Sequence, residues 1–311
     1  MEKQTPINYH LIVPVGTQIV TSVEIKGSGG EVFYPRGAVG EIIKAPVDNT
    51  HAYRVRFLDG SEYNLHRQEL AIRKHVQSDG LLQQEAADFD PQPHLIYHCV
   101  LGSRAYGLEN ESSDTDRRGI YVAPAEMQWS LYGAPEQVEK QETQECYWEV
   151  QRFLVLALKA NPNILECLYT PLVEQAAPLA EELLAMRASF LSKLIFQTYN
   201  GYVMSQFKKL EQDLRTKGAI KMKHAMHLIR LLIAGITALQ EGYVPVRVEQ
   251  HRERLLSIRR GEVPWEEVNA WRLSLHKTFD AAFAATALAE RPDYAKANAF
   301  LIRVRRSMVT L

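Results

Sequence analysis

Two aspartates one residue apart, Asp114 and Asp116, follow a Gly-Ser pair, Gly102 and Ser103, with ten residues between the two pairs. Carboxylates at positions i and i+2 of a strand point to the same face. They repel each other there, so both stay ionised only beside a cation. Mg²⁺ takes oxygen ligands of this kind together with substrate phosphates, and a nearby glycine lets a phosphate approach the backbone closely. The spacing predicts metal-dependent phosphoryl transfer, although the composition of "ENESSDTD" also fits a plain acidic turn.

The segments that would position these residues read as strands followed by helices. The apolar run "LIYHCVLGS" has the length of a strand, "TDRRGIYVAP" predicts a second strand, and the polar "QVEKQETQECYW" predicts a third. Beyond Glu149 the apolar residues recur at helical spacing. This order predicts an α+β domain in which helices pack on a sheet.

Composition divides the chain into four parts. Residues 1–75 consist of short alternating segments with a hairpin signal at Asp59-Gly60, which predicts a small β-barrel that resembles SH3-like barrels in general. The polar residues 76–94 predict a linker. Residues 95–175 predict a catalytic domain, and the long amphipathic segments of 176–311 predict a helical bundle.

The charge of the chain is unevenly distributed. The 311 residues have a formal net charge of −1, so no overall basic charge marks a nucleic-acid-binding protein. Residues 81–150 nevertheless have a net charge of −9 and residues 197–260 one of +7. Such a division suits a metal on one wall of a site and a polyanion on the other, and it is also common for two solvated faces.

The cysteines and the apolar segments indicate the compartment. The three cysteines form no C-x-x-C pair, which argues against structural zinc and a disulfide framework and fits a reducing environment. The N-terminal sequence lacks a signal-peptide pattern, and no apolar run of 18 residues occurs. We expect a cytoplasmic protein without a membrane partner.

The motif around the two aspartates resembles the signature of the DNA polymerase β-like nucleotidyltransferase superfamily: an apolar residue, G-[GS], a spacer, then D-x-[DE]. The nearer resemblance is to a bacterial family predicted to act in RNA repair, the RlaP-like family. It is carried by "GSRAYG", "SSDTDRRGIYVAP", "YWEVQRFLVLALKANPNILECLYTP" and "KMKHAMHLIRLL". These blocks lie within residues 95–260 and leave the predicted barrel outside. The resemblance implies a polymerase-β-like core, an NTP substrate and Mg²⁺ or Mn²⁺ as the metal.

The resemblance also implies roles for residues at matching positions. Gly102, Ser103 and the adjacent Arg104 would bind the nucleotide through its triphosphate. Asp114 and Asp116 would hold the metals and act as catalytic carboxylates. Thr115 and Arg117 stand where the superfamily usually has apolar residues.

The third carboxylate of the superfamily, which activates the attacking group, lies on the following strand. The matching position falls on Gln144, which does not replace a carboxylate. If Cys146 faces the core, Glu145 points to the opposite side, which we take to be the catalytic one. We favour Glu145 as the third catalytic and metal-binding residue. Glu142 and Glu149 stay open, although Glu149 also fits an acid in the first turn of a helix.

The helical half supplies a candidate cationic wall. Lys223, His227 and Arg230 are spaced i, i+4, i+7 and share a helix face beside apolar residues, where cations need anionic partners. Tyr199 and Tyr202 lie on another predicted helix. We predict that all five contact the nucleotide. The alternative is that the tyrosines are core residues and the cations are surface residues.

The positive charge of 197–260 exceeds what one triphosphate needs, which favours RNA as a partner. The candidate contacts are Lys208, Lys209, Lys217, Arg252 and Arg254, with Tyr53, Arg54 and Arg56 from the predicted barrel. A solvated helix face is the alternative.

We therefore predict an enzyme that transfers a nucleoside monophosphate from an NTP to an acceptor hydroxyl on RNA, either tRNA or an RNA 3′ end. One alternative is a nucleotidyltransferase that modifies a protein or a small molecule, as in toxin–antitoxin pairs or antibiotic resistance. Another is an RNA-binding module without catalysis. The sequence indicates neither the NTP nor the oligomeric state.

Overall fold

The computed structural model describes residues 12–27, 30–46, 51–73, 89–111, 113–140 and 142–309. The chain divides into two compact units, Met1–Asp88 and Phe89–Leu311. Most of the predicted linker, residues 76–88, lies outside the described residues. Its last part belongs to the second unit, because Phe89 packs beside Tyr121 with ring centroids 5.2 Å apart and residues 92–94 form a 3-10 turn, η2.

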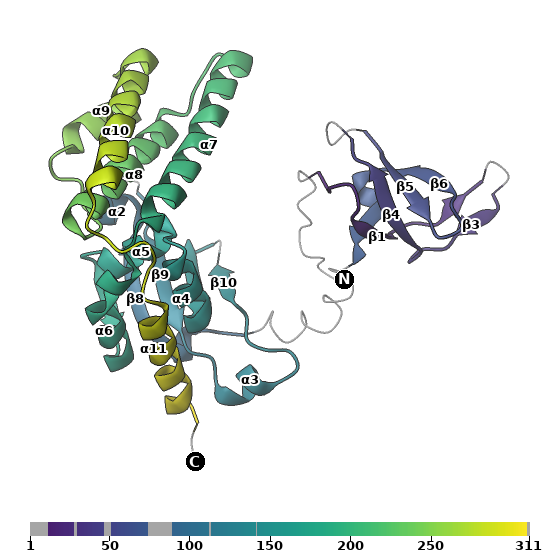
Figure 1. Ribbon diagram of the computed structural model, residues 1–311, viewed down its shortest axis with the longest axis horizontal. Coiled ribbons are helices and arrows are strands. Elements are labelled where there is room, and N and C mark those ends of the chain that lie inside the picture. The colour runs from purple at the N-terminus through teal and green to yellow at the C-terminus, as the bar shows by residue number, and fades with distance from the viewer. Residues whose placement is uncertain are drawn as a thin grey trace. The chain divides into compact units, whose positions relative to one another are not determined.

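The first unit is a small antiparallel β structure (Figure 1). Its five-stranded sheet has the order β6-β5-β4-β1-β7. The strands are β1 (Gln18–Thr21), β4 (Val39–Lys44), β5 (Tyr53–Phe57), β6 (Glu62–Leu65) and β7 (Leu70–Ile72), with the turn η1 (Arg67–Glu69) before β7. A separate hairpin pairs β2 (Ile25–Lys26) with β3 (Val32–Tyr34). The likeness to SH3-like barrels stays a prediction.

The alternating sequence of β5 decides which of its side chains are buried. Tyr53 and Val55 are fully buried, and the Tyr53 hydroxyl accepts a hydrogen bond from the Val13 N–H at 3.1 Å. The prediction that Tyr53 offers its ring to RNA is therefore wrong. Arg54 and Arg56 point outward, and both pair with Glu62 across the hairpin.

The second unit is built on a mixed five-stranded sheet with the order β10-β11-β9-β8-β12. The strands are β8 (Leu95–Leu101), β9 (Asp116–Tyr121), β10 (Gln137–Lys140), β11 (Glu145–Glu149) and β12 (Val173–Ala176). β11 runs parallel to β9, and the other neighbours are antiparallel. The connection from β9 to β11 contains the short helix α3 (Ala125–Trp129) and β10. The second unit is thus the α+β fold that the sequence predicts.

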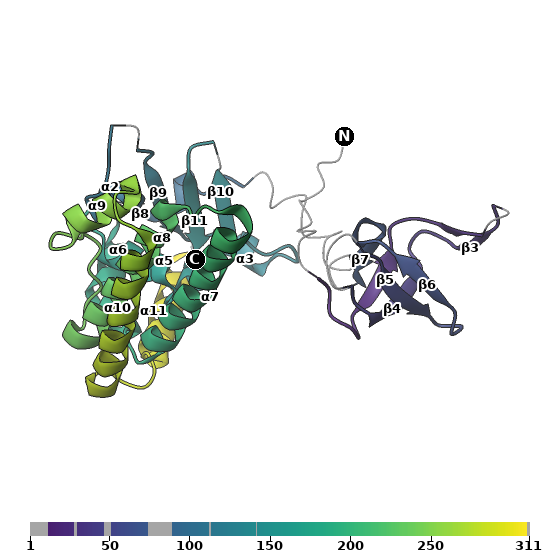
Figure 2. The same cartoon turned by 90° about the horizontal axis from the view of Figure 1, so that it is seen from above.

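Helices pack on this sheet and extend beyond it (Figures 1 and 2). The helices after β8 and β11 are α2 (Gly102–Tyr106), α4 (Val150–Leu158), α5 (Pro162–Tyr169) and α6 (Pro178–Ala185), followed by the turn η3 (Arg187–Phe190). The long helices are α7 (Leu194–Lys217), α8 (Met222–Glu241) and α10 (Trp265–Ala285), with the shorter α9 (Arg252–Arg260). The last helix, α11 (Tyr294–Ser307), returns to pack on α4.

One hydrophobic core joins the sheet to the helices. It runs from Tyr97 and Cys99 of β8 through Phe153 of α4 to Leu232 of α8 and Phe300 of α11. Because the core is continuous, the structure holds residues 89–311 as one unit. The finer division into a catalytic domain and a bundle stays a prediction.

Helix α8 is long and apolar enough to cross a membrane by length and composition alone. In the structure 67% of the relevant window is buried inside the protein. A core helix passes the same test, so α8 is no sign of a membrane span.

Candidate active site

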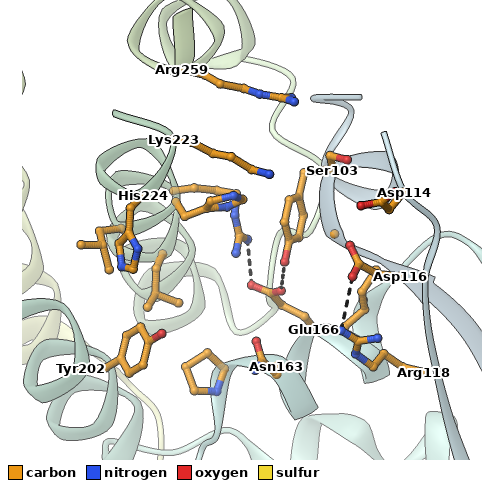
Figure 3. A pocket seen from close by; sticks show the side chains of 18 of the residues that line it. Ser103, Asp114, Asp116, Arg118, Asn163, Glu166, Tyr202, Lys223, His224 and Arg259 are labelled. Carbon is orange, nitrogen blue, oxygen red and sulfur yellow. Dashed lines mark hydrogen bonds and ion pairs between the residues drawn. The ribbon is translucent and has the colours of Figure 1, made fainter. Parts of the chain in front are cut away.

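A cavity of about 840 Å³ lies between the end of β8, the start of β9 and the helices α5, α7 and α8 (Figure 3). Its wall on the sheet side contains Gly102, Ser103, Asp114, Asp116 and Arg118. Its helical wall contains Asn163 and Glu166 from α5, Tyr202 from α7, Lys223, His224, His227 and Arg230 from α8, and Arg259 from α9. The cavity thus brings together most of the predicted site residues.

Gly102 lies against the carboxylate of Asp116. The register of β8 and β9 pairs Leu101 with Asp116, and Gly102 then turns into α2 with φ of +68°. A Cβ added at Gly102 would lie 1.9 Å from Asp116 Oδ2, 2.8 Å from its Cγ and 3.2 Å from its Cβ. Only glycine fits this close approach and this left-handed conformation. The Gly-Ser pair and the aspartates therefore form one local structure.

Contacts from the C-terminal helices hold the α2 turn in place. The carbonyl groups of Tyr106, Gly107 and Leu108 accept hydrogen bonds at the end of α2. The donors are the Val248 N–H at 3.1 Å, Arg252 Nε at 2.8 Å and Arg259 Nη1 at 2.5 Å. The last carbonyl groups of a helix have no hydrogen-bond partner within that helix. The three bonds supply such partners and hold the C-terminal end of α2 in place.

Asp114 and Asp116 both line the cavity, and Figure 3 shows them side by side. β9 begins at Asp116, so Asp114 belongs to the extended segment before the strand. Asp114 is exposed, and Asp116 Oδ1 lies 3.5 Å from Arg118 Nη2. Most of their oxygen atoms are thus available on the cavity side.

The two carboxylates fit a hard divalent cation. The described residues contain no group of three His, Cys, Asp or Glu side chains arranged to hold a metal. A metal here would rely on Asp114, Asp116, water and substrate oxygens, which is the usual protein environment of Mg²⁺. The role of the two aspartates as metal ligands stays a prediction.

The structure does not bring Glu145 together with the aspartates. Cys146 does face the core, but it pairs with Arg118, and Arg118 shares its face with Asp116. Glu145 pairs with Arg117 on the other face, where it hydrogen-bonds with Tyr147. The expectation that Glu145 points to the catalytic side was wrong, because the helix-covered face of the sheet is also the face of Asp116.

Neither of the other acids fills the position. Glu142 lies in the exposed turn before β11. Glu149 is the N-cap of α4, accepts a hydrogen bond from the Gln151 N–H, and forms a two-fold ion pair with Arg305 at 2.6 and 3.0 Å. Gln144 lies in the turn before β11 with a positive φ of 57°, and its carbonyl accepts a hydrogen bond from Arg118 Nη1 at 2.9 Å.

Basic side chains of α8 and α9 face the aspartates across the cavity (Figure 3). Lys223 is exposed, and His227 is half-buried. Burial, followed by the charges of Arg230 and Lys223, lowers the pKa of His227 to about 4. The imidazole is therefore neutral at pH 7 and offers hydrogen bonds rather than charge. His224 and Arg259 also line this wall, and the sequence interpretation missed both.

Arg230 is buried and forms an ion pair within the protein. It is 5% exposed and its Nη1 lies 2.7 Å from Glu166 Oε1. Its guanidinium also stacks over the Tyr106 ring at 3.6 Å, and the Tyr106 hydroxyl donates to Glu166 Oε2 at 2.7 Å. The partner that Arg230 needs at the border of the core is thus Glu166, which is 1% exposed. Because Arg230 also lines the cavity, its predicted contact with the nucleotide stays a prediction.

Of the three remaining residues predicted to contact the nucleotide, Tyr199, Tyr202 and Arg104, only Tyr202 lines the cavity. Tyr202 is 49% exposed and lines the cavity, whereas Tyr199 is fully buried in the core and does not. Arg104 does not line the cavity, and its Nη2 donates to the carbonyl of Ser113, which does, at 2.9 Å. Arg104 therefore braces the loop before Asp114 instead of lining the cavity.

The site thus belongs to an α+β protein whose cleft has two carboxylates and a glycine turn on one wall and basic side chains on the other. The chain belongs to the RNA repair pathway DNA polymerase beta family, RlaP, whose model matches residues 69–303. The resemblance inferred from the motifs is thereby confirmed. Membership suggests a polymerase-β-like nucleotidyltransferase.

A relative of Bacillus subtilis (strain 168), "Uncharacterized protein YcgL", is 26% identical over 156 residues. The match covers 49% of this chain and 58% of the relative. The chain thus matches little more than half the length of that protein.

Proposed function

We propose that the protein transfers a nucleoside monophosphate from an NTP to a hydroxyl group of RNA, with release of pyrophosphate and with Mg²⁺ or Mn²⁺ as the metal. The observation that carries this proposal is the contact between Gly102 and Asp116. A glycine in the left-handed conformation, with no room for a side chain against a carboxylate, ties the Gly-Ser turn to the aspartates. This is the arrangement expected where a triphosphate and its metal share one site.

The chain's own residues would act by positioning and by charge. Asp114 and Asp116 would hold the metal, which would neutralise phosphate charge. Lys223 and Arg259 stand on the opposite wall as donors to phosphate oxygens, and Tyr202 offers an exposed ring for a base. Such transfer depends on positioning and electrostatics more than on covalent chemistry by the protein.

In the proposed reaction the acceptor oxygen bonds to the α-phosphorus and the bond to the bridging oxygen of pyrophosphate breaks. Pyrophosphate leaves with that electron pair, and the acceptor loses its hydroxyl proton.

A second candidate function is RNA binding without transfer. It is favoured by Gln144, an amide at the sequence position where the superfamily has its third carboxylate. Loss of that carboxylate would slow the attack of the acceptor and leave nucleotide binding intact.

The test is incubation of the full chain with each labelled NTP, Mg²⁺ or Mn²⁺, and total RNA or tRNA. Label in RNA that disappears in Asp116→Asn supports the proposal. Label in the protein itself or in a small molecule would identify the other class of acceptor. RNA binding without label under any of these conditions would favour the second candidate.

A further inference from the structure

A second cavity, of about 660 Å³, adjoins the first. The two share Arg118, Asn161 and Asn163 as lining residues, so they meet at one side of Asp116. The second cavity then runs along β11 and β10 to α4. A transferase needs two places around the reacting phosphorus, one for the nucleotide donor and one for the acceptor.

The walls of the second cavity differ from those of the first. Its surface is largely polar, with Gln137, Gln144, Asn161 and Asn163 among the lining residues. The apolar lining residues Cys146, Trp148 and Ile164 are buried, and the indole N–H of Trp148 donates to Gln137 Oε1 at 2.8 Å. A polar lining of this kind suits the edge of a nucleobase, which carries hydrogen-bond donors and acceptors.

Three cations line the second cavity, Arg118, Lys140 and Arg152, together with two carboxylates, Glu139 and Glu145. Lys140 Nζ also lies 3.4 Å from Asp90 Oδ1. Arg152 Nε is buried and has no hydrogen-bond partner among the described residues, while Arg152 Nη1 lies 3.3 Å from Glu136. A buried donor without a partner costs free energy unless a ligand supplies an acceptor. A phosphate oxygen is such an acceptor, and guanidinium groups bind phosphate well.

We propose that the second cavity binds the 3′-terminal nucleotide of the RNA acceptor. The base lies along the polar lining of the cavity, its phosphate is held by Arg152 and Lys140, and its ribose hydroxyl reaches Asp116 past Arg118. The hydroxyl oxygen bonds to the α-phosphorus, pyrophosphate leaves, and the hydroxyl proton passes to water. This inference rests on the proposed function and assigns its acceptor subsite. A neutral or basic acceptor would not need the cations.

The position of the RNA end is tested by crosslinking to the full chain. An oligoribonucleotide with 4-thiouridine as its 3′-terminal residue is irradiated with the protein, and the crosslinked peptides are sequenced. The proposal expects crosslinks within residues 137–164. Crosslinks confined to other peptides, or no crosslink at saturating RNA, would overturn it.

The energetic test uses Arg152→Gln and Lys140→Gln, with Arg303→Gln as the matched control. Arg303 pairs with Glu182 on the surface and lines neither cavity. Each cavity variant should raise the KM for RNA about tenfold, because each loses a hydrogen bond to a charged group, and such a bond contributes at least this factor to binding. The KM for NTP should stay at the wild-type value. The control should change neither constant.

Binding measurements separate the inference from the proposed function. If the wild-type chain binds an NTP analogue and transfers label, but Arg152→Gln and Lys140→Gln keep wild-type RNA affinity, the acceptor subsite is wrong and the function stands. An equal loss of NTP and RNA affinity in both variants would also overturn the subsite. If the wild-type chain neither binds NTP nor transfers label, the proposed function fails and the subsite fails with it.

Discussion

The substitution Gly102→Ala is the sharpest perturbation of the candidate site. It adds one methyl group at a residue with φ of +68°, directed at the Asp116 carboxylate. The added Cβ would meet Oδ2 at 1.9 Å, and an ordinary contact begins near 3.4 Å, so the oxygen must move by about 1.5 Å. Rotation of the carboxylate alone does not relieve the crowding, because the Asp116 Cβ also lies 3.2 Å away.

The expected effect on activity is much larger than the effect on stability. An alanine in the left-handed conformation costs about 1–2 kcal/mol, against a total stability of about 5–15 kcal/mol, so the unit stays folded. In a unit of this size the cost corresponds to a fall in Tm of about 2–8 °C. A displacement of 1 Å in a catalytic group lowers the rate about 100-fold. We therefore expect kcat to fall at least about 100-fold.

The matched control is Gly107→Ala, at the other end of the same helix. Gly107 also has a positive φ, +71°, but its nearest neighbours would be Arg247 Nε at 3.5 Å and Arg247 Cγ at 3.6 Å. Gly107→Ala therefore has the same conformational cost of a left-handed alanine, but the added methyl group does not contact Asp116. Transfer of label to RNA and thermal unfolding are measured for both variants and the wild type.

Two results would refute the reasoning. If Gly102→Ala transfers label at the wild-type rate while its Tm falls as expected, the position of Asp116 does not matter for the reaction. If both variants lose activity equally, the effect comes from the fold of α2 and not from the contact with the carboxylate.

Further substitutions test the other groups of the site. Asp114→Asn should abolish transfer, while the free energy of unfolding in EDTA should change by no more than a surface substitution would cause, about 0.5 kcal/mol. Glu145→Gln should retain transfer, since Glu145 lies on the other face of the sheet. Glu166→Gln leaves a buried guanidinium without its carboxylate and should cost about 3–5 kcal/mol of unfolding free energy in urea. Burial, followed by neighbouring basic groups, lowers the pKa of His227 to about 4 in the folded chain. The unfolded chain has a pKa of about 6.5 at this residue and therefore binds a proton first as the pH falls. The free energy of unfolding is thus at its full value above pH 6.5 and decreases as the pH falls toward 4. His227→Gln should flatten that part of the stability–pH profile in urea unfolding, and an unchanged slope would contradict the assignment.

The local features of the second unit were predictable because short-range patterns specify them. The apolar run "LIYHCVLGS" and the segment "TDRRGIYVAP" give β8 and β9, and the helical periodicity gives α4, α8, α10 and α11. Gly242, with φ of +72°, is the C-cap of α8. Helix α9 was missed, because its nine residues are mostly charged and few of them bury a side chain.

Two features of the site depend on tertiary structure and were not predictable. The face of Glu145 depends on which side of the sheet the helices cover, and the alternation within β11 does not contain that information. The partner of Arg230 lies 64 residues away in α5. A glutamate inside the otherwise apolar "NPNILECLY" was the available sign that Glu166 is buried and paired.

The net charge of the basic segment 197–260 overestimates the number of cations available to RNA, because several of them have partners within the protein. Arg230 neutralises Glu166, Arg252 and Arg259 hold the carbonyls of the α2 turn, and Arg254 stacks on Trp271 at 3.8 Å. Arg252 and Arg254, two of the cations predicted to meet RNA, are thus engaged within the fold. Lys208 and Lys209 of α7 remain as exposed lysines for which the described residues supply no ion-pair partner, and the side chain of Lys217 lies outside the described residues. Of the helical cations, Arg252 and Arg259 thus hold the C-terminal end of α2. The cations that line the second cavity come from β9, β10 and α4, outside the basic segment.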